Sequence, residues 1–196
     1  VLARPKTPPM WASNPPCCTD AMLYRAPAWL PGGHAQTIWS ALYARRRWGP
    51  AVPSQRERWV TPDNDFIDVD RQQASRQDRP LVVLFHGLEG SSDSHYAQAF
   101  ADWAAAHDFN FALPHFRGCS GELNHAPRAY HSGDHAEIDF FLRKFKQQAD
   151  LNQRPGVMAA GVSLGGNALM RWAGEQGLRA PSIVKAVASI CAPLDL

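Results

Sequence analysis

Long apolar runs, regularly spaced cysteines and a large excess of either charge are all absent from this 196-residue sequence. No apolar run approaches the roughly 18 residues that span a bilayer, and the N-terminus lacks the basic, apolar and small-residue order of a secretory signal. The formal net charge of +2 gives no bulk attraction to nucleic acid or to an anionic membrane surface. We therefore predict neither a transmembrane segment nor a nucleic-acid partner.

The four cysteines stand at positions that match neither a CxxC zinc or redox pair nor a small disulfide scaffold: Cys17, Cys18, Cys119 and Cys191. We interpret them as reduced thiols and expect a cytoplasmic protein. Cys119 is not expected to act as a nucleophile, because the sequence implies no basic partner for it.

The chain divides by composition near residue 50. Residues 1–50 are predicted to be a proline-rich arm followed by a Pro-Gly-Gly-His segment, since the first 16 residues contain five prolines and few periodic apolar positions. Residues 51–196 contain enough apolar sequence for one domain core. Because the chain begins at Val1 rather than Met and ends directly after a predicted strand, we expect it to be part of a longer protein.

The pattern of residues 51–196 predicts an α/β fold with a mostly parallel sheet. Two alternating segments, 55–60 and 66–70, flank a Pro-Asp-Asn-Asp turn and predict an antiparallel hairpin. Buried strands then alternate with amphipathic helices, as in parallel βαβ units. The strands are predicted at 81–85, 109–113, 156–161 and 183–190, and the helices within 94–107, around 134–145 and at 166–175.

The motif Gly161-Val162-Ser163-Leu164-Gly165-Gly166 lies between a predicted strand and a predicted helix, the context that a GxSxG nucleophile elbow requires. In such a turn the serine adopts strained backbone angles, and the flanking glycines prevent collisions between neighbouring side chains. Ser163 is therefore the candidate nucleophile. The helix N-terminus stabilises negative charge, so the Leu164 N–H is the expected first oxyanion donor.

Two other interpretations of this motif explain less. A chance GxSxG does not account for its position at the end of the third strand of a βα series. A dinucleotide-binding loop needs a glycine where Ser163 stands and an acidic residue at a strand end about 20 residues later, and the sequence offers neither.

The segment His86-Gly87-Leu88-Glu89-Gly90-Ser91-Ser92 follows the strand 81–85, where such a fold places its second oxyanion donor. The Leu88 N–H is the best candidate, because it directly follows the His-Gly pair. We interpret His86 as a loop brace rather than a general base, since a base must reach Ser163 Oγ within about 3 Å.

Several segments, in order and spacing, resemble the YheT-like α/β-hydrolases, also called the AB hydrolase 4 family. They lie at residues 31–38, 86–96, 117–122, 130–133, 161–168 and 192–196. The resemblance implies an α/β-hydrolase fold, here incomplete at the C-terminus, and a serine hydrolase of carboxylic esters: short- or medium-chain acyl esters and, in some relatives, acylglycerols or phospholipids. The family nucleophile maps onto Ser163, whereas its aspartate and histidine lie beyond residue 196.

Three further groups of residues have competing interpretations. Asp195 follows the last strand, where some hydrolases place the triad acid, but the family keeps its acid later, so a structural role is favoured. His131 and His135, with Asp134 between them, have a spacing that could bind zinc on a helix, but Gly133 disfavours a regular helix there and no third ligand is evident, so we predict loop braces and no metal site. The basic run 45–48 is most simply a solvated surface.

The predicted chemistry is a two-step ester hydrolysis in which Ser163 attacks the carbonyl and the N–H groups of Leu88 and Leu164 hold the oxyanion. It needs no cofactor, and the expected partner is a small-molecule or lipid ester; the oligomeric state stays open. The alternatives are a non-catalytic binding protein or inactive fragment on the same scaffold, and an acyltransferase to alcohols.

Overall fold

The computed structural model describes residues 25–43, 53–76 and 78–194. The chain divides into two compact units, residues 1–43 and 44–196. The predicted proline-rich stretch of the first 16 residues, Cys17, Cys18, the basic run 45–48 and Asp195 lie outside the described residues.

The first unit contains the helix α1 (Gly33–Tyr43). The chain turns into this helix at Gly32, whose φ of +78° favours glycine. The Gln36 side chain then donates to the Leu30 carbonyl at 3.2 Å, and the rings of Trp29 and Trp39 meet edge to face with their centroids 5.2 Å apart. The Pro-Gly-Gly-His segment is thus a turn and the start of a short helix.

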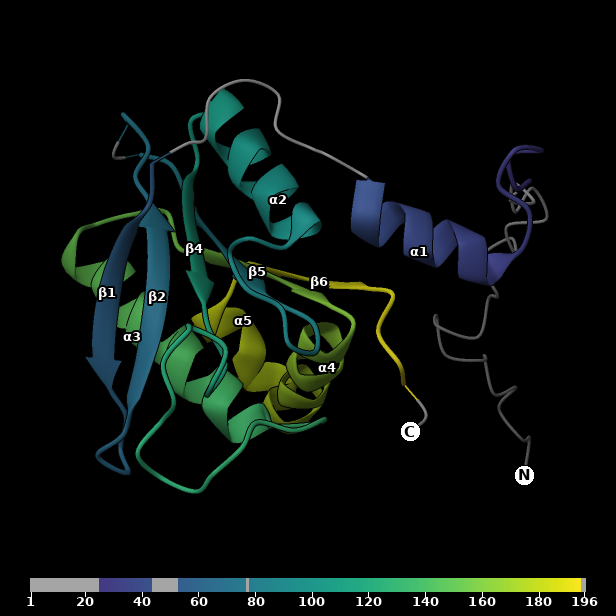
Figure 1. Cartoon of the computed structure of the whole chain (residues 1–196). Coiled ribbons are helices and arrows are strands. Elements are labelled where there is room, and N and C mark those ends of the chain that lie inside the picture. The colour runs from purple at the N-terminus through teal and green to yellow at the C-terminus, as the bar shows by residue number, and fades with distance from the viewer. Residues whose placement is uncertain (1–24, 44–52, 77, 195–196) are drawn as a thin grey trace, which may run out of the picture. The chain divides into compact units, whose positions relative to one another are not determined.

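The described residues of the second unit form one six-stranded sheet with helices on both faces (Figure 1). Along the chain its elements are β1 (Gln55–Val60), β2 (Phe66–Gln72), β3 (Leu81–Phe85), α2 (His95–Ala106), β4 (Asn110–Pro114), α3 (His135–Leu151), β5 (Val157–Val162), α4 (Leu164–Gln176), the 3-10 turn η1 (Gly177–Arg179), α5 (Ala180–Ile183) and β6 (Ala186–Ile190).

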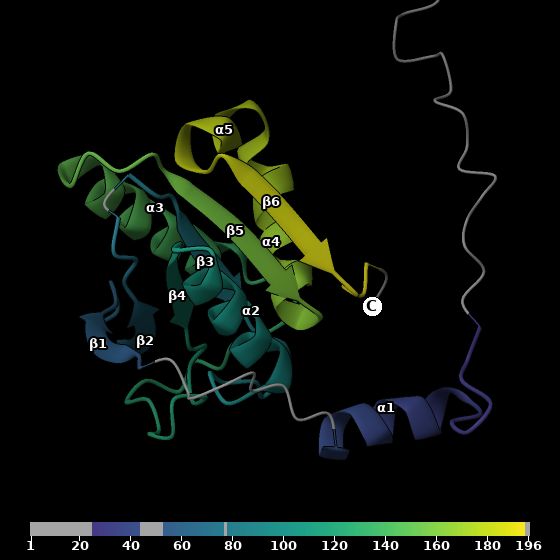
Figure 2. The same ribbon diagram turned by 90° about the horizontal axis from the view of Figure 1, so that it is seen from above.

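The strand order is β1-β2-β4-β3-β5-β6, which Figure 2 shows from one edge of the sheet to the other. β1 pairs antiparallel with β2 in a register that sets Trp59 opposite Ile67, and β2 pairs antiparallel with β4. The pairs β3–β4, β3–β5 and β5–β6 are parallel. The predicted mostly parallel sheet with an N-terminal antiparallel hairpin is therefore confirmed.

Alternate residues of the central strand serve two separate hydrophobic cores. In β3, Leu81, Val83 and Phe85 face a core shared with α3 and α4, while Val82 and Leu84 face a smaller core under α2. All five side chains are buried, as a central parallel strand covered on both faces requires. This layering holds the C-terminal ends of β3 and β5 side by side.

The strand predicted at 183–190 is wrong in its first three residues. Ile183 closes the helical turn α5, in which Pro181 occupies an early position and the Val184 N–H donates to the Ala180 carbonyl at 3.0 Å. Ile183 and Val184 are buried, so their apolar character reflects packing of this turn rather than strand structure. The other predicted elements are present with ends shifted by no more than two residues, except that the helix predicted around 134–145 continues to Leu151.

Candidate active site

Ser163 occupies a sharp turn between β5 and α4. Its backbone has φ +51° and ψ −117°, a conformation that is unfavourable for a residue with a side chain. Hydrogen bonds on both sides hold it there: the Ser163 N–H donates to the Ile190 carbonyl, and the Ser163 carbonyl accepts from the Asn167 N–H, each at 2.9 Å. The strained strand-to-helix turn predicted from the GxSxG motif is therefore present, and the partly exposed Ser163 lies at its apex.

The glycines around Ser163 allow β5, α4 and β3 to approach one another closely. A Cβ atom on Gly161 would lie 2.5 Å from the Gly165 carbonyl oxygen, and one on Gly165 would lie 2.5 Å from the Phe85 carbonyl oxygen. A Cβ on Gly166 would lie 2.8 Å from the Gly161 carbonyl oxygen. The motif thus needs glycine for contacts between backbones, in addition to relief beside the serine.

The loop after β3 lies against Ser163. A Cβ atom added to Gly87 would be 3.3 Å from Ser163 Cβ, a tight contact that would push the two residues apart by a few tenths of an ångström. This contact brings the predicted donor loop 86–92 to Ser163, as the parallel pairing of β3 with β5 requires. Leu88 follows Gly87 in this loop and Leu164 follows Ser163 in the chain, so both predicted oxyanion donors belong to residues next to the contact.

His86 is completely buried and hydrogen-bonded at both ring nitrogens. Its Nε2 accepts from the Phe116 N–H at 2.9 Å, and its Nδ1 lies 2.7 Å from the Gly87 carbonyl oxygen, to which it donates. Burial lowers the pKa of His86 to about 4, so the ring is neutral near pH 7. Both nitrogens are used within the fold, which agrees with its interpretation as a loop brace rather than a base.

The opposite end of the donor loop is tied to a buried carboxylate. Asp70 accepts from Arg56 Nε at 2.7 Å and pairs with His115 Nε2 at 2.9 Å. Ser92, the last residue of the loop, also hydrogen-bonds to Asp70, and these partners hold the Asp70 pKa well below its usual range against the opposing effect of burial. Sequence reasoning did not find this contact, because Asp70 is far from Ser92 along the chain.

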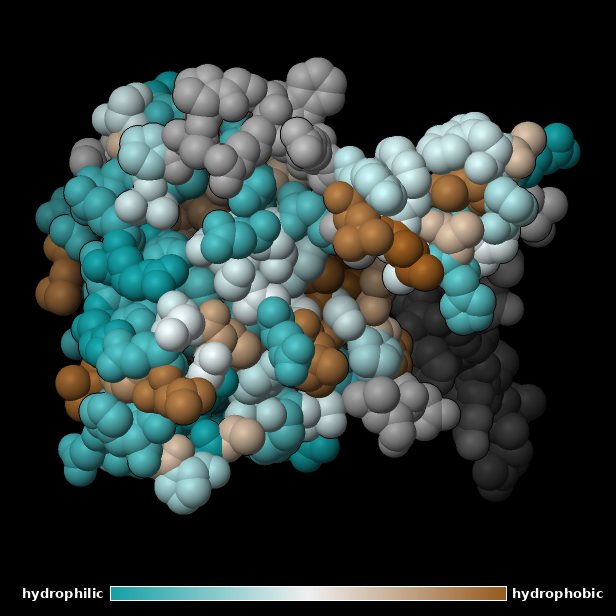
Figure 3. Space-filling model, viewed as in Figure 1, coloured by the Kyte–Doolittle hydropathy of each residue, from teal (hydrophilic) through white to brown (hydrophobic). Residues whose placement is uncertain are grey.

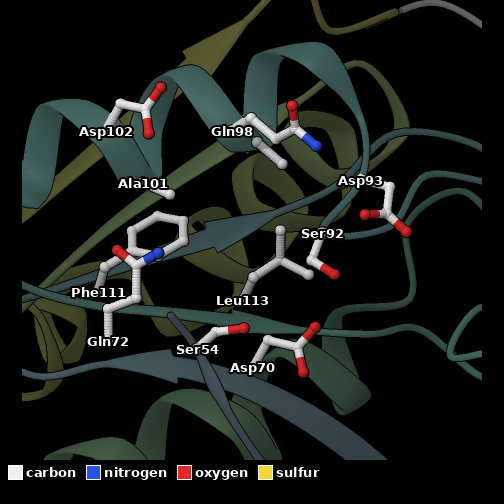
Figure 4. Close-up of a pocket in the computed structure, with 11 residues that line it drawn as sticks. Ser54, Asp70, Gln72, Ser92, Asp93, Gln98, Ala101, Asp102, Phe111 and Leu113 are labelled. Carbon is white, nitrogen blue, oxygen red and sulfur yellow. The ribbon is translucent and has the colours of Figure 1, made fainter. Parts of the chain in front are cut away.

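A pocket of about 180 Å³ lies beside this contact, between α2 and strands β2 and β4. Figure 4 shows the residues that line it. Asp70, Ser92 and Gln72 line it together with the apolar side chains of Phe111 and Leu113. Ser163 and Leu88 are not among its lining residues. The pocket therefore belongs to the α2 face of the sheet and is separate from Ser163.

The residues considered as zinc ligands, His131, Asp134 and His135, have other partners. Asp134 caps α3, accepting from the Glu137 N–H and from Arg128 at 2.8 Å, while His131 Nε2 is 3.9 Å from Asp134. Within the described ranges no group of three or more His, Cys, Asp or Glu side chains is arranged to hold a metal ion. At Cys119, burial raises the pKa of the thiol, which disfavours a thiolate nucleophile.

Two tyrosines and an asparagine that the sequence did not single out as site residues hold the loops around Ser163. The Tyr96 hydroxyl accepts from the Gly87 N–H and the Tyr130 hydroxyl from the Glu89 N–H. Asn167, in the first turn of α4, accepts from the Gly133 N–H at 2.8 Å and donates to the Pro193 carbonyl at 2.7 Å. A sequence pattern could assign Tyr96 only to an apolar helix face, because its hydroxyl partner lies in another segment.

A family model described as the alpha/beta hydrolase fold matches residues 80–196, which include the elbow and the donor loop. The chain belongs to this family. Within the family, the predicted resemblance to YheT is confirmed: the chain is 37% identical to YheT of Escherichia coli (strain K12) over 166 residues, 83% of this chain and 46% of that protein.

Other relatives carry names that describe ester chemistry. The chain is 30% identical to medium-chain fatty acid ethyl ester synthase/esterase 2 of Saccharomyces cerevisiae over 66% of this chain and 28% of that protein. The solved structure of brefeldin A esterase, described as a bacterial homologue of human hormone-sensitive lipase, superposes with a TM-score of 0.58 at 15% identity over 80% of this chain and 45% of that one. The chain spans less than half the length of each of these proteins.

The surface of the larger unit is mostly hydrophilic in the view of Figure 3, with apolar residues in separate patches. Among the described residues, no helix has both the length and the apolar character needed to cross a bilayer.

Proposed function

We propose that the complete protein is a serine hydrolase of carboxylic esters that forms an acyl-enzyme on Ser163. The observation that carries this proposal is the backbone of Ser163, held at φ +51° between β5 and α4 and in contact with the Gly87 loop. Strained backbone conformations of this kind cluster at functional sites, where the surrounding structure maintains them. The esterase names of the relatives support the same chemistry.

The proposed reaction has two steps. Ser163 Oγ bonds to the ester carbonyl carbon while a histidine, which the resemblance places beyond residue 196, takes the hydroxyl proton and passes it to the departing alcohol. Water then attacks the acyl-enzyme, releasing the carboxylic acid and restoring the Ser163 hydroxyl. The N–H groups of Leu88 and Leu164 stabilise the oxyanion in both steps.

The proposal is tested by Ser163→Ala in the complete gene product. We expect wild type to hydrolyse p-nitrophenyl butyrate and to react covalently with a fluorophosphonate at Ser163, and the variant to lose on the order of 10⁶-fold in kcat. Ser182→Ala, which removes an exposed hydroxyl bonded to the Arg179 carbonyl, is the matched control and should keep full activity. Esterase activity that survives in Ser163→Ala, or a wild type that neither reacts nor labels, would favour the non-catalytic scaffold.

A second candidate is transfer of the acyl group to an alcohol, which the name of the yeast synthase/esterase favours. The same acyl-enzyme would form on Ser163, and an alcohol would replace water in the second step. Product analysis with p-nitrophenyl octanoate in buffered ethanol separates the two reactions, because hydrolysis yields octanoic acid and transfer yields ethyl octanoate. A series of acyl chain lengths in the same assay would define the substrate class.

A further inference from the structure

The amides on either side of Leu88 are both bound by phenol hydroxyls from other parts of the fold. The Gly87 N–H donates to the Tyr96 hydroxyl at 2.9 Å, and the Glu89 N–H donates to the Tyr130 hydroxyl at 2.7 Å. Between them, the Leu88 N–H has no acceptor among the described residues. We propose that Tyr96 and Tyr130 are positioning residues that orient the Leu88 N–H toward the oxyanion formed at Ser163; this inference rests on the proposed function.

The Gly87 carbonyl, on the peptide that carries the Leu88 N–H, accepts from the Gly90 N–H at 3.0 Å and from His86 Nδ1 at 2.7 Å. These bonds hold the carbonyl side of that peptide, and the two phenols hold the amides before and after it. The Leu88 side chain is 70% exposed, so packing cannot hold it. Glu89 is also exposed and adopts φ +50°, which is unfavourable for a residue with a side chain. A strained conformation persists only where its surroundings determine it, and here the phenol hydroxyls bind the Gly87 and Glu89 amides while the Gly90 N–H closes the turn on the Gly87 carbonyl.

Each phenol is itself held in place. Tyr96 lies in the first turn of α2, and a Cβ atom on Gly90 would be 2.5 Å from its hydroxyl oxygen, so the loop bends closely around the phenol. The Tyr130 ring stacks on Phe116, with centroids 5.3 Å apart and planes inclined by 8°. Phe116 in turn stacks on Phe85, at the end of β3. Both hydroxyls are therefore fixed relative to the strand that leads to the donor loop.

This placement matters because an oxyanion donor acts only when it is aimed beforehand at the position where charge develops. Loss of either hydroxyl would free one neighbouring amide, and the Leu88 peptide, then held mainly through the Gly87 carbonyl, could tilt its N–H away from the oxyanion. The resulting loss should appear in the transition state and not in ground-state substrate binding. If the two tyrosines served only the stability of the fold, their loss would not affect the transition state more than substrate binding.

The experiment uses Tyr96→Phe, Tyr130→Phe and the double variant of the complete gene product, with p-nitrophenyl butyrate as substrate. We expect each single variant to lose about 10-fold in kcat with KM within twofold, and the double variant to approach the roughly 10²- to 10³-fold loss of one oxyanion donor. The inhibition constant of an alkylboronic acid, which forms a tetrahedral adduct with the serine, should rise by the same factors as kcat falls. Tyr43→Phe, at an exposed tyrosine of α1, is the control and should change neither quantity.

Amide hydrogen exchange supplies a readout that does not depend on activity: exchange at residues 87–89 should accelerate in the variants while β3 and β5 keep wild-type protection. Variants that stay within twofold of wild type in kcat, or that lose kcat with unchanged boronate inhibition, would overturn the positioning role while leaving Ser163 as nucleophile. A wild type that a fluorophosphonate does not label would overturn the proposed function and this inference together.

Discussion

At the scale of single residues, the candidate site depends on glycines that have no role in chemistry. Gly165 lies in the first turn of α4 directly against β3, and a Cβ there would lie 2.5 Å from the Phe85 carbonyl oxygen. Gly165→Ala must therefore push the helix away from the strand, and we expect it to lower the free energy of unfolding by about 3 kcal/mol, as overpacking of a core does. Urea denaturation measures the change.

Gly174 in the same helix provides the matched control. A Cβ at this position meets no heavy atom within 4 Å, and its backbone is helical. Gly174→Ala should raise the free energy of unfolding by about 0.5–1 kcal/mol, because alanine loses less backbone entropy than glycine in a helix interior. Equal effects of the two substitutions would show that the close approach of α4 to β3 does not constrain residue 165.

Some of these residue roles could be predicted from sequence and others could not. Ser163 and its glycines stand at fixed local spacing, because the elbow is one continuous turn, and the motif therefore predicted its geometry. Tyr96 and Tyr130 act through hydroxyls that reach another segment, 9 and 41 residues away from their partners. No local pattern encodes such pairings, since they depend on how the sheet brings separate loops together.

At the scale of elements, one buried guanidinium joins the hairpin turn to helix α3. Arg117 follows β4 and pairs with Asp65 at 3.0 Å and with Glu137 at 2.7 Å, and all three side chains are at most 3% exposed. Arg117→Met would leave two carboxylates buried without their cation, so we expect a loss of about 3–5 kcal/mol in the free energy of unfolding. Thermal and urea unfolding of the variant measure it.

Arg143→Met is the corresponding control on the surface of α3. Arg143 is 54% exposed and pairs with Asp139 one helical turn away, an arrangement that contributes less than about 1 kcal/mol. If both substitutions lowered the free energy of unfolding by the same amount, burial would not be the reason that the Arg117 ion pairs stabilise the fold.

The order of the elements along the chain was easier to predict than their order in the sheet. An apolar run located β3, helical periodicity located α3, and alternation around a Pro-Asp-Asn-Asp turn located the hairpin, because each pattern is local. The position of β4 between β2 and β3 follows from pairing over distant residues, which the sequence pattern does not contain. The strand predicted from residue 183 failed for a related reason: a buried helical turn and a buried strand give the same short apolar run.

At the scale of the whole molecule, the neutral His86 links folding stability to pH. Its folded pKa is about 4, against 6.5 as the ordinary value. Between these values the unfolded chain binds a proton that the folded protein does not, so stability falls as pH falls from 6.5 toward 4. Lowering the pH from 7.5 to 5 should reduce the free energy of unfolding by about 2 kcal/mol through this group.

Urea denaturation of wild type and His86→Gln at both pH values isolates the contribution of this residue. Glutamine does not titrate, so the variant should lose about 2 kcal/mol less than wild type over the interval, whatever its stability at pH 7.5. Burial raises the pKa of Glu137, so this carboxyl also contributes to the pH dependence of stability. The comparison removes its effect, because that carboxyl is present in both proteins. An identical pH dependence would mean that His86 is protonated in the folded state at pH 5, where its Nε2 could then no longer accept from the Phe116 N–H.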